Sequence, residues 1–293
     1  MNIVDKNIEY YRKRAGMTRK DLAEGICDES TLFRIEKGSQ NPRLDLLFEI
    51  SKKLKIPLKF LMSELPFSDF KEIEKYKQLC REHTYYQDYE ALSLTIEQFE
   101  NLIEQNSDHV EYLTNKKFIT WNKAILLHVR DKNLIKAEEQ LHSILDTKLR
   151  TEFDIGVCNS LGLVKLSKDG VSIALEYFNK AYAAIEELPQ LEDHTLTPRV
   201  AYNVAYCHVK NGQFNEATTL AYQIIGLLES KQLSFILGKT KHMLGKIHKM
   251  CGEYEQAKEY LLEAQFLFRL EKNEAYYLKT EEDLNEVRLL LEK

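Results

Sequence analysis

The sequence predicts an all-α protein, in which a small N-terminal domain of five helices is followed by an array of helix pairs. Only 5 prolines and 11 glycines occur in 293 residues. This scarcity disfavours turn-rich sandwiches and barrels, and it favours long helices joined by short connections. The net charge changes from +3 in residues 1–66 to -8 in the remainder. A basic head on an acidic body is typical of a DNA-binding module joined to a non-binding one.

Several protein classes are disfavoured by the sequence. Apolar residues make up 44 % of the chain, enough for a packed core and too many for a disordered protein. No apolar run approaches the roughly 20 residues that span a bilayer, and the N-terminus lacks the apolar segment of a signal peptide. We therefore expect a cytoplasmic protein with no membrane contact. The five cysteines are scattered, with no CxxC pair, so we expect reduced thiols, no metal and no cofactor, with redox sensing as the alternative role.

Local signals bound the first two helices of the head. Residues 8–14 form a helical stretch, and Gly16 follows it at a position suited to a helix C-cap. Thr18 stands three residues before Asp21, which resembles a capping box with Asp in place of Glu. A short second helix is therefore expected over residues 18–25.

Three further helices complete the head. Asp28 is placed to cap a third helix over residues 29–37. Pro42 and Pro57 are placed to open a fourth and a fifth helix, because the N–H that proline lacks has no partner in a first helical turn. Five short helices with a tight link between the second and the third indicate a helix-turn-helix domain, which we place at residues 1–65.

Three runs of the head match a known family in spacing and residue type: RKRAGMTRKDLA from residue 12, STLFRIEKG from residue 30 and NPRLDLL from residue 41. These runs resemble the Cro/C1-type repressors, whose third helix enters the major groove of DNA. Carried over by position, the residues that would contact base edges are Glu29, Ser30, Phe33 and Arg34. The candidates for contacts with DNA phosphates are Arg14, Thr18, Arg19, Lys37, Ser39, Asn41 and Arg43. Arg12 and Glu36 match a pair that the family uses as an internal salt bridge.

Two positions depart from the family pattern. Phe33 stands where a small polar residue is usual, and Arg19 stands where Gln is common. Arg34 suits a bidentate contact to guanine and Phe33 suits a thymine methyl, whereas Glu29 fits either a cytosine amine or simple solvation. Because one head of this kind covers little DNA, we expect a homodimer that reads two half-sites about 34 Å apart.

From residue 72 onward, five segments share a pattern in which a polar turn is followed by an alanine. These alanines are Ala91, Ala137, Ala174, Ala217 and Ala257, at intervals of 46, 37, 43 and 40 residues. Twelve positions earlier, the best segments carry a small residue that lets two helices cross closely: Gly162, Ala205 and Gly245.

This pattern predicts about five degenerate tetratricopeptide-like helix pairs, stacked as a right-handed superhelix over residues 72–293. A capping helix is expected near residues 281–291, and residues 66–71 are the expected linker to the head. An irregular helical bundle without superhelical stacking is the alternative.

The first helices of successive units would line the concave side of such an array. By the register of the repeat, the inner positions that would bind a peptide include Asn122, Asn159, Tyr202, Asn203, Tyr206, His242 and Lys246. Asparagine amides satisfy both the N–H and the C=O groups of an extended peptide, tyrosine rings cover its side chains, and a cation neutralises a terminal carboxylate. The same side chains serve equally well in hydrogen bonds between helices, so both interpretations stand.

A Cro/C1-type head joined to such an array resembles the RRNPP group of peptide-pheromone-sensing regulators of Gram-positive bacteria, and in size and layout its PlcR-like members. The resemblance implies a transcription regulator for quorum sensing, whose homodimer binds a double-stranded DNA operator. It also implies that a short signalling peptide binds the repeat domain and shifts the dimer between DNA-binding states. Asn159 and Asn203 fall where the group's peptide-backbone asparagines occur.

Two other functions are weighed against this one. In the first, the head still binds DNA, but the array docks a protein partner and no peptide pheromone exists. In the second, the chain is an enzyme. Because the sequence carries no phosphate-binding glycine loop, nucleophile elbow or HExxH motif, we expect no catalytic residues and no enzyme activity.

Overall fold

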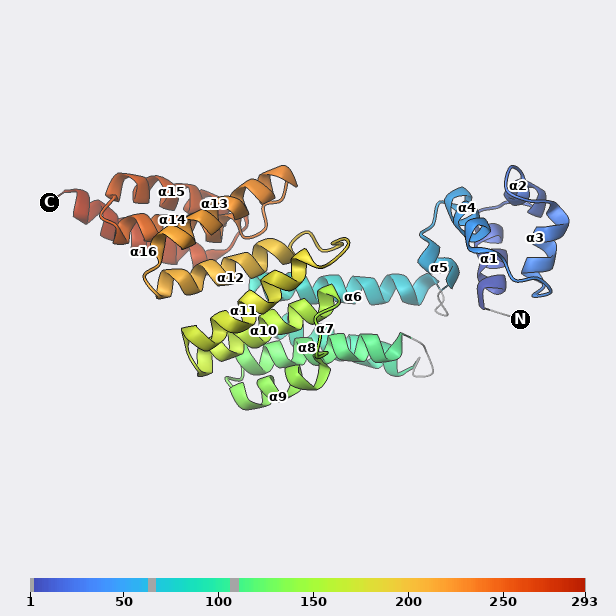
Figure 1. The fold of residues 1–293 in the computed structure, drawn as a ribbon, viewed down its shortest axis with the longest axis horizontal. Helices are drawn as coiled ribbons and strands as arrows, with labels where there is room; N and C mark the ends of the chain where they lie inside the picture. Colours follow the sequence, from blue (N-terminus) through green and yellow to red (C-terminus); the bar gives the residue numbers. More distant parts are fainter. Residues whose placement is uncertain (1–2, 63–66, 106–110, 293) are drawn as a thin grey trace. The chain divides into compact units, whose positions relative to one another are not determined.

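The computed structural model describes residues 3–62, 67–105 and 111–292. Within these ranges the backbone forms sixteen helices and no strand, which confirms the predicted all-α class (Figure 1). Among the described helices, none combines the length and the apolar character needed to cross a membrane.

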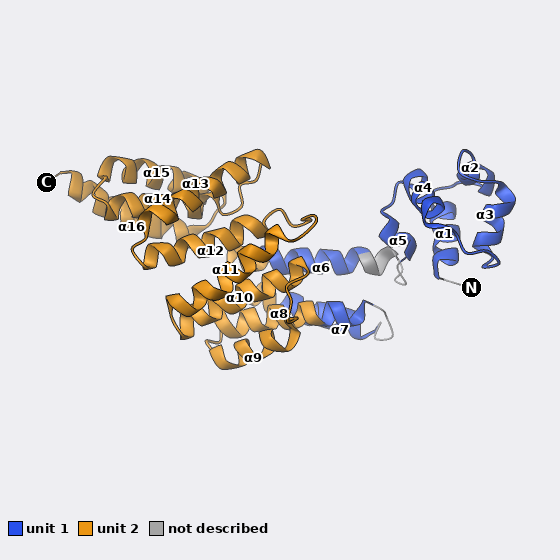
Figure 2. Ribbon diagram, in the orientation of Figure 1, with its two compact units in different colours: residues 1–82, 94–116 blue, residues 83–93, 117–293 orange. Residues whose placement is uncertain are grey.

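Backbone contacts divide the chain into two compact units (Figure 2). The first contains residues 1–82 and 94–116, and the second contains residues 83–93 and 117–293. Of the linker expected before the repeats, Pro66 lies outside the described residues, and residues 67–71 belong to a long helix. The boundary expected at residue 65 also lies outside the described residues.

Five helices build the head, as predicted. They are α1 (Ile3–Arg14), α2 (Arg19–Ala23), α3 (Glu29–Glu36), α4 (Leu44–Leu54) and α5 (Leu58–Met62). Their apolar side chains form one core, in which Ile8, Leu32 and Ile50 are fully buried. The capping box predicted at the start of α2 is present, because Thr18 and Asp21 each bond the other's backbone N–H.

The two prolines of the head do not open helices, which corrects the prediction. Arg43 is the N-cap of α4, with extended backbone at φ -74° and ψ 157°, so Pro42 lies one residue outside the helix. An N-cap residue has non-helical torsion angles, and the helix therefore begins only at the next residue. Pro57 likewise precedes α5. Asp28 occupies the N-cap position of α3 as expected, but its side chain makes no capping hydrogen bond.

The remainder of the described chain consists of five helix pairs and a final helix. The pairs are α6 (Phe67–Tyr86) with α7 (Tyr89–Glu104), α8 (Tyr112–Val129) with α9 (Leu134–Ile144), α10 (Glu152–Lys168) with α11 (Val171–Glu186), α12 (Leu196–Lys210) with α13 (Phe214–Ser230), and α14 (Leu237–Met250) with α15 (Tyr254–Leu270). The final helix, α16 (Glu274–Leu291), begins earlier than the predicted residue 281.

Stacking of the pairs is visible in their contacts. From α9 to α16 each helix packs on the next, and α10, α12, α14 and α16 also pack on one another in that order (Figure 1). These four alternate helices are called the inner layer below. Their mutual contacts are those of a helical repeat and not of an irregular bundle.

Small residues set the close crossings within the pairs, as the repeat register predicts. A Cβ atom added to Gly162 of α10 would lie 2.4 Å from the ring of Phe178 of α11. A Cβ atom added to Gly245 of α14 would lie 2.6 Å from Cγ of Leu261 of α15. Each glycine therefore admits an apolar side chain of its partner helix that any larger residue would push away.

Three of the five cysteines are buried: Cys80, Cys158 and Cys207. Burial raises the pKa of Cys80 to about 12 and the pKa values of Cys158 and Cys207 to about 11. These thiols remain protonated at neutral pH and are poor nucleophiles. Cys27 is half-buried and Cys251 is exposed.

Candidate functional site

Helix α3 turns one face to the core of the head and the other to solvent. Its Leu32, Ile35 and Glu36 are fully buried. On the opposite face, the four residues predicted to contact bases are all exposed: Glu29, Ser30, Phe33 and Arg34. Phe33 is the apolar residue among these four, and 46 % of its surface is accessible.

A buried carboxylate joins three helices beneath this face. Arg12 of α1 donates to Glu36 of α3 at 2.6 Å (Nε to Oε1) and 3.0 Å (Nη2 to Oε2). The internal pair expected from the resemblance is therefore present. Arg19 of α2 donates its Nε to Oε2 of the same carboxylate at 2.6 Å, a contact that the sequence did not predict. The hydrogen bond to Glu36 and its charge raise the pKa of Arg12, although burial alone would lower it.

Two of the arginines near α3 adopt defined positions. The guanidinium carbon of Arg19 lies 5.1 Å from the centre of the Phe33 ring, a cation–π distance. Arg34 is folded back on its own helix, with Nε 3.3 Å from the carbonyl oxygen of Ser30. Its side chain is exposed, so it can be redirected towards a base edge without breaking a buried contact.

The residues predicted to contact phosphates are spread along the head, from the last residue of α1 to the N-cap of α4. Six of them are exposed, namely Arg14, Thr18, Lys37, Ser39, Asn41 and Arg43, and Arg19 is half-buried. The Thr18 hydroxyl donates to Asp21 at 2.6 Å, and the Ser39 hydroxyl donates to the carbonyl oxygen of Arg34 at 3.0 Å. Arg43 extends into solvent beside Asp45, with Nε and Oδ1 3.2 Å apart.

In the inner layer, the structure brings two of the predicted peptide-binding residues together. Asn203 of α12 donates its Nδ2 to Oδ1 of Asn159 of α10 at 2.8 Å. Asn159 is buried, whereas Asn203 is half-buried. Asn122 of α8 is also buried, and it bonds the carbonyl oxygen of Phe118 in its own helix at 2.9 Å.

A second polar group of the inner layer is centred on Asp283 of α16. His242 of α14 lies with Nε2 2.8 Å from Oδ2 of Asp283, and Lys249 donates to Oδ1 at 2.7 Å. Lys246 is more distant, with Nζ 4.0 Å from the carboxylate. Burial raises the pKa of Asp283, but the bonds from His242 and Lys249 and the lysine charges outweigh it and hold the pKa well below its usual value.

Tyr202 and Tyr206 of α12 belong to an aromatic group. Burial raises the pKa of Tyr202, and nearby Tyr276 of α16 and Tyr206 raise it further. Lys239 of α14 lies between two rings, with Nζ 5.2 Å from the centre of Tyr85 and 4.7 Å from that of Tyr276. Burial lowers the pKa of Lys239.

Sequence reasoning missed Asp283, Tyr276 and Lys239. The first two lie on α16, which follows the last repeat and has no partner helix whose spacing would fix its inner positions. Lys239 lies near the N-terminus of α14, ahead of the positions counted from the repeat alanine. Lys239 lies three residues before His242. Residues three apart are neighbours on a helix, so this spacing would have placed Lys239 on the same face as His242.

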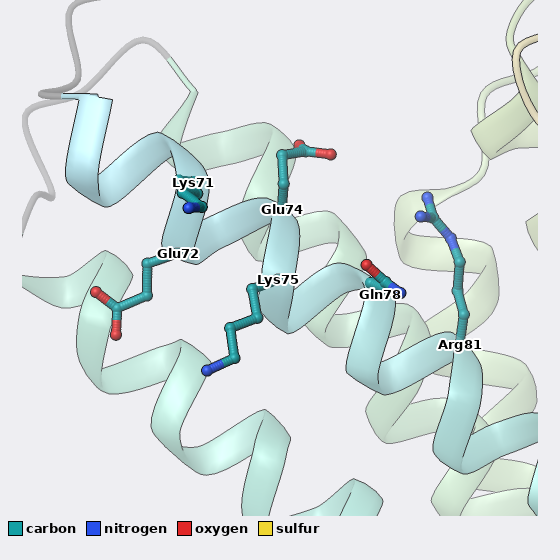
Figure 3. Close-up of a pocket in the computed structure, with 6 residues that line it drawn as sticks. All are labelled: Lys71, Glu72, Glu74, Lys75, Gln78 and Arg81. Carbon is teal, nitrogen blue, oxygen red and sulfur yellow. The ribbon is translucent and has the colours of Figure 1, made fainter.

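A hollow also lies along α6, lined by Lys71, Glu72, Glu74, Lys75, Gln78 and Arg81 (Figure 3). All of these side chains come from one helix, and all are exposed. Acidic and basic groups are mixed along it, which favours ordinary solvation over recognition of a charged ligand.

Comparison with known proteins supports the two-part architecture. Residues 8–61 match the family described as helix-turn-helix. No curated protein sequence matches the chain.

Three solved structures share the fold over nearly the whole chain. Bacillus thuringiensis PlcR, in complex with the peptide PapR7 and DNA, has a TM-score of 0.81 and 19% identity, and the match covers 96% of this chain and 99% of that one. ComR from S. thermophilus, in complex with DNA and its signalling peptide ComS, has a TM-score of 0.62 and 16% identity over 97% and 99% of the two chains. The SHP pheromone receptor Rgg2 of Streptococcus dysgalactiae has a TM-score of 0.56 and 16% identity over 97% and 99%.

Proposed function

We propose that this chain is a sequence-specific DNA-binding transcription regulator of the cytoplasm, and that its repeat domain binds a short signalling peptide. In this proposal, the chain works as a homodimer, and the peptide shifts the dimer between states that differ in affinity for an operator. PlcR and ComR share the fold. PlcR was solved with the peptide PapR7 and DNA, and ComR with DNA and its signalling peptide ComS. That likeness supports the proposal for this chain.

The observation that carries the DNA-binding part is the solvent face of α3. This helix is the second of the helix-turn-helix pair, its core side is sealed by Leu32 and Ile35, and its exposed side offers polar, cationic and apolar groups. Such a face matches the donor, acceptor and methyl pattern of a major groove. The surrounding cations and hydroxyls suit the phosphates that fix the register of the helix on DNA.

The peptide-binding part is supported by the polar groups of the inner layer. An asparagine amide both donates and accepts, so it pairs with either backbone group of an extended peptide. In the structure the amides of Asn159 and Asn203 bond each other. A peptide that engages them would exchange this bond for two bonds of its own, and it would alter the link between α10 and α12.

The coupling between peptide and DNA is a population shift. A peptide moves the equilibrium only by the difference between its affinities for the two states of the dimer. A coupling of about 1–3 kcal/mol is usual, which corresponds to about a 5- to 150-fold change in DNA affinity.

The experiment that tests the proposal is DNA binding by the full-length chain. Duplexes are selected from a random pool, and the region upstream of the gene is included as a candidate. Binding is then measured with and without synthetic peptides from neighbouring small reading frames, with scrambled peptides as controls. We expect one peptide to change the dissociation constant at least fivefold.

Each failure points to a different error. If no duplex is selected, the DNA-binding part of the proposal is wrong. If duplexes are selected but no peptide changes their affinity, the peptide part is wrong and docking of a protein partner takes its place.

A further inference from the structure

We propose that Arg19 is a positioning residue, which fixes the ring of Phe33 on the DNA-reading face so that Phe33 recognises the methyl group of a thymine. This inference rests on the proposed DNA-binding function. It also replaces the expectation that Arg19 contacts a phosphate. Three observations carry it: the anchoring of Arg19, its contact with Phe33, and the exposure of that ring.

The guanidinium of Arg19 is held by a buried carboxylate of the head. Its Nε donates to Oε2 of Glu36 at 2.6 Å, and Glu36 is fully buried. The carboxylate is itself held by the two hydrogen bonds from Arg12. Because this carboxylate is buried and bonded to both arginines, the position of the Arg19 guanidinium is tied to the core of the head.

The anchored guanidinium in turn packs against Phe33. The distance from its central carbon to the ring centre is 5.1 Å, within the range of a cation–π contact. An exposed phenylalanine without such a contact samples several rotamers, and binding would cost the entropy of selecting one of them. Arg19 selects the rotamer in advance, and Phe33 still leaves 46 % of its surface accessible for a ligand.

The guanidinium of Arg19 is paired with carboxylates of the protein itself. Besides Glu36, its Nη2 lies 3.9 Å from Oε1 of Glu9, so two carboxylates face this one cation. Lys13 lies 2.8 Å from the same Glu9 oxygen. Its hydrogen bond holds the pKa of Glu9 below the usual value, helped by the charges of Lys13, Lys37 and Arg19, although burial raises it. A DNA phosphate would have to compete with both carboxylates for Arg19. Among the described residues, the exposed Arg43 is paired with one carboxylate, that of the exposed Asp45.

The ligand follows from the chemistry of the ring. Phe33 neither donates nor accepts hydrogen bonds, and the apolar group that a base offers in the major groove is the C5 methyl of thymine. Uracil is the same base without that methyl. Burial of one methyl-sized group contributes about a fourfold gain in affinity, so replacement of thymine by uracil should lose about that factor.

The test uses the full-length chain and the duplexes that the wild type selects from a random pool. Each thymine is replaced by uracil in turn, and the dissociation constant is measured over a range of salt concentrations. We expect one thymine in each half-site at which uracil weakens wild-type binding about fourfold. This sensitivity should be absent in Phe33→Ala, and also in Arg19→Lys and Arg19→Gln. The exposed neighbour Lys20 provides the matched control, since Lys20→Gln should keep the uracil sensitivity.

The salt dependence separates positioning from phosphate binding. Arg19→Lys retains the charge but lacks the planar group that stacks on Phe33, so it should keep the salt slope and lose the uracil sensitivity. Arg19→Gln should also keep the slope. The inference is overturned if Arg19→Gln lowers the slope by about one unit and stays uracil-sensitive, because that behaviour belongs to a phosphate contact. It is also overturned if no thymine is sensitive in the wild type. Thermal melting of each variant checks that the head is folded, and selection of no duplex at all would instead refute the proposed function.

Discussion

Arg12 of α1 and Glu36 of α3 are joined by two hydrogen bonds across 24 positions of sequence, in a site where the carboxylate has no solvent access. The pair ties the first helix of the head to α3, whose exposed face is the proposed DNA-reading face. Because Arg19 also bonds the carboxylate, two cations depend on a single buried anion.

Replacement of this anion should unfold the head. Glu36→Ala leaves Arg12 buried without its partner, and removal of one member of a buried ion pair costs about 3–5 kcal/mol. We expect the melting transition of the head to fall or disappear in circular dichroism, while the helical signal of the repeats remains. Glu29→Ala, on the exposed face of the same helix, is the control and should melt like the wild type. A Glu36→Ala head of unchanged stability would contradict the structural role of the pair.

Two arginines on the DNA side should have different effects. Arg34→Ala removes a group that suits a bidentate contact to guanine, so preference for the operator over random DNA should fall by about 1–3 kcal/mol. Arg43→Ala removes a group proposed to contact a phosphate, so it should weaken binding to all sequences and lower the salt slope by about one unit. Fluorescence anisotropy with operator and random duplexes measures both. Unchanged specificity in Arg34→Ala would move base reading to other residues.

The asparagine pair should control the peptide response. Asn203→Ala removes one of the two amides that a peptide backbone would bond, and it leaves the head untouched. We expect DNA binding without peptide to be intact and peptide affinity to fall about tenfold, the effect of one lost polar contact. Asn179→Ala, on the exposed side of α11, is the matched control. Normal peptide affinity in Asn203→Ala would remove the inner layer as the binding site.

Two helical glycines should respond in opposite directions to the same substitution. Gly162→Ala places a Cβ atom 2.4 Å from the Phe178 ring, and overpacking of this kind costs about 1–3 kcal/mol. Gly226, on α13, has nothing within 4 Å of an added Cβ atom. Gly226→Ala should therefore stabilise the chain by up to about 1 kcal/mol through helix propensity. Urea unfolding of the two variants decides this, and equal effects would show that the α10–α11 crossing is not sterically set.

The Asp283 site should make stability depend on pH in acid. Its pKa in the folded chain lies below the ordinary 3.8, so the ionised form stabilises the fold above that pH, and the contribution is lost as the pH falls through the folded value. Asp283→Asn should cost about 2–3 kcal/mol near neutral pH, where charged hydrogen bonds from His242 and Lys249 are lost. The gap in melting temperature between wild type and variant should begin to narrow below about pH 4 and continue to narrow as the pH falls towards the folded pKa of Asp283. A gap of constant size across that range would contradict the assignment.

The sequence predicted the features that are set within a few residues or by one repeat. The Thr18–Asp21 capping box and the Gly162 crossing are examples, because each depends on a fixed spacing along one or two neighbouring helices. Pro42 was misplaced because proline suits both the first helical turn and the extended residues before it.

Contacts between distant segments could not be read from the sequence. The bond from Arg19 to Glu36 depends on how α2 and α3 pack, and the position of Asp283 depends on the docking of a helix outside the repeat. A surface arginine that ought to attract phosphate thus proves to be bonded to a buried carboxylate.

The uneven exposure of the thiols gives the chain a natural attachment point for a reporter. Cys251, at the C-terminal end of α14, is exposed, while Cys80, Cys158 and Cys207 are buried and protonated. A maleimide dye applied briefly near pH 7 will therefore couple first at Cys251, without any engineered substitution. The dye then lies at one end of the helix that carries His242 and Lys246, where its emission can report events on that helix in real time.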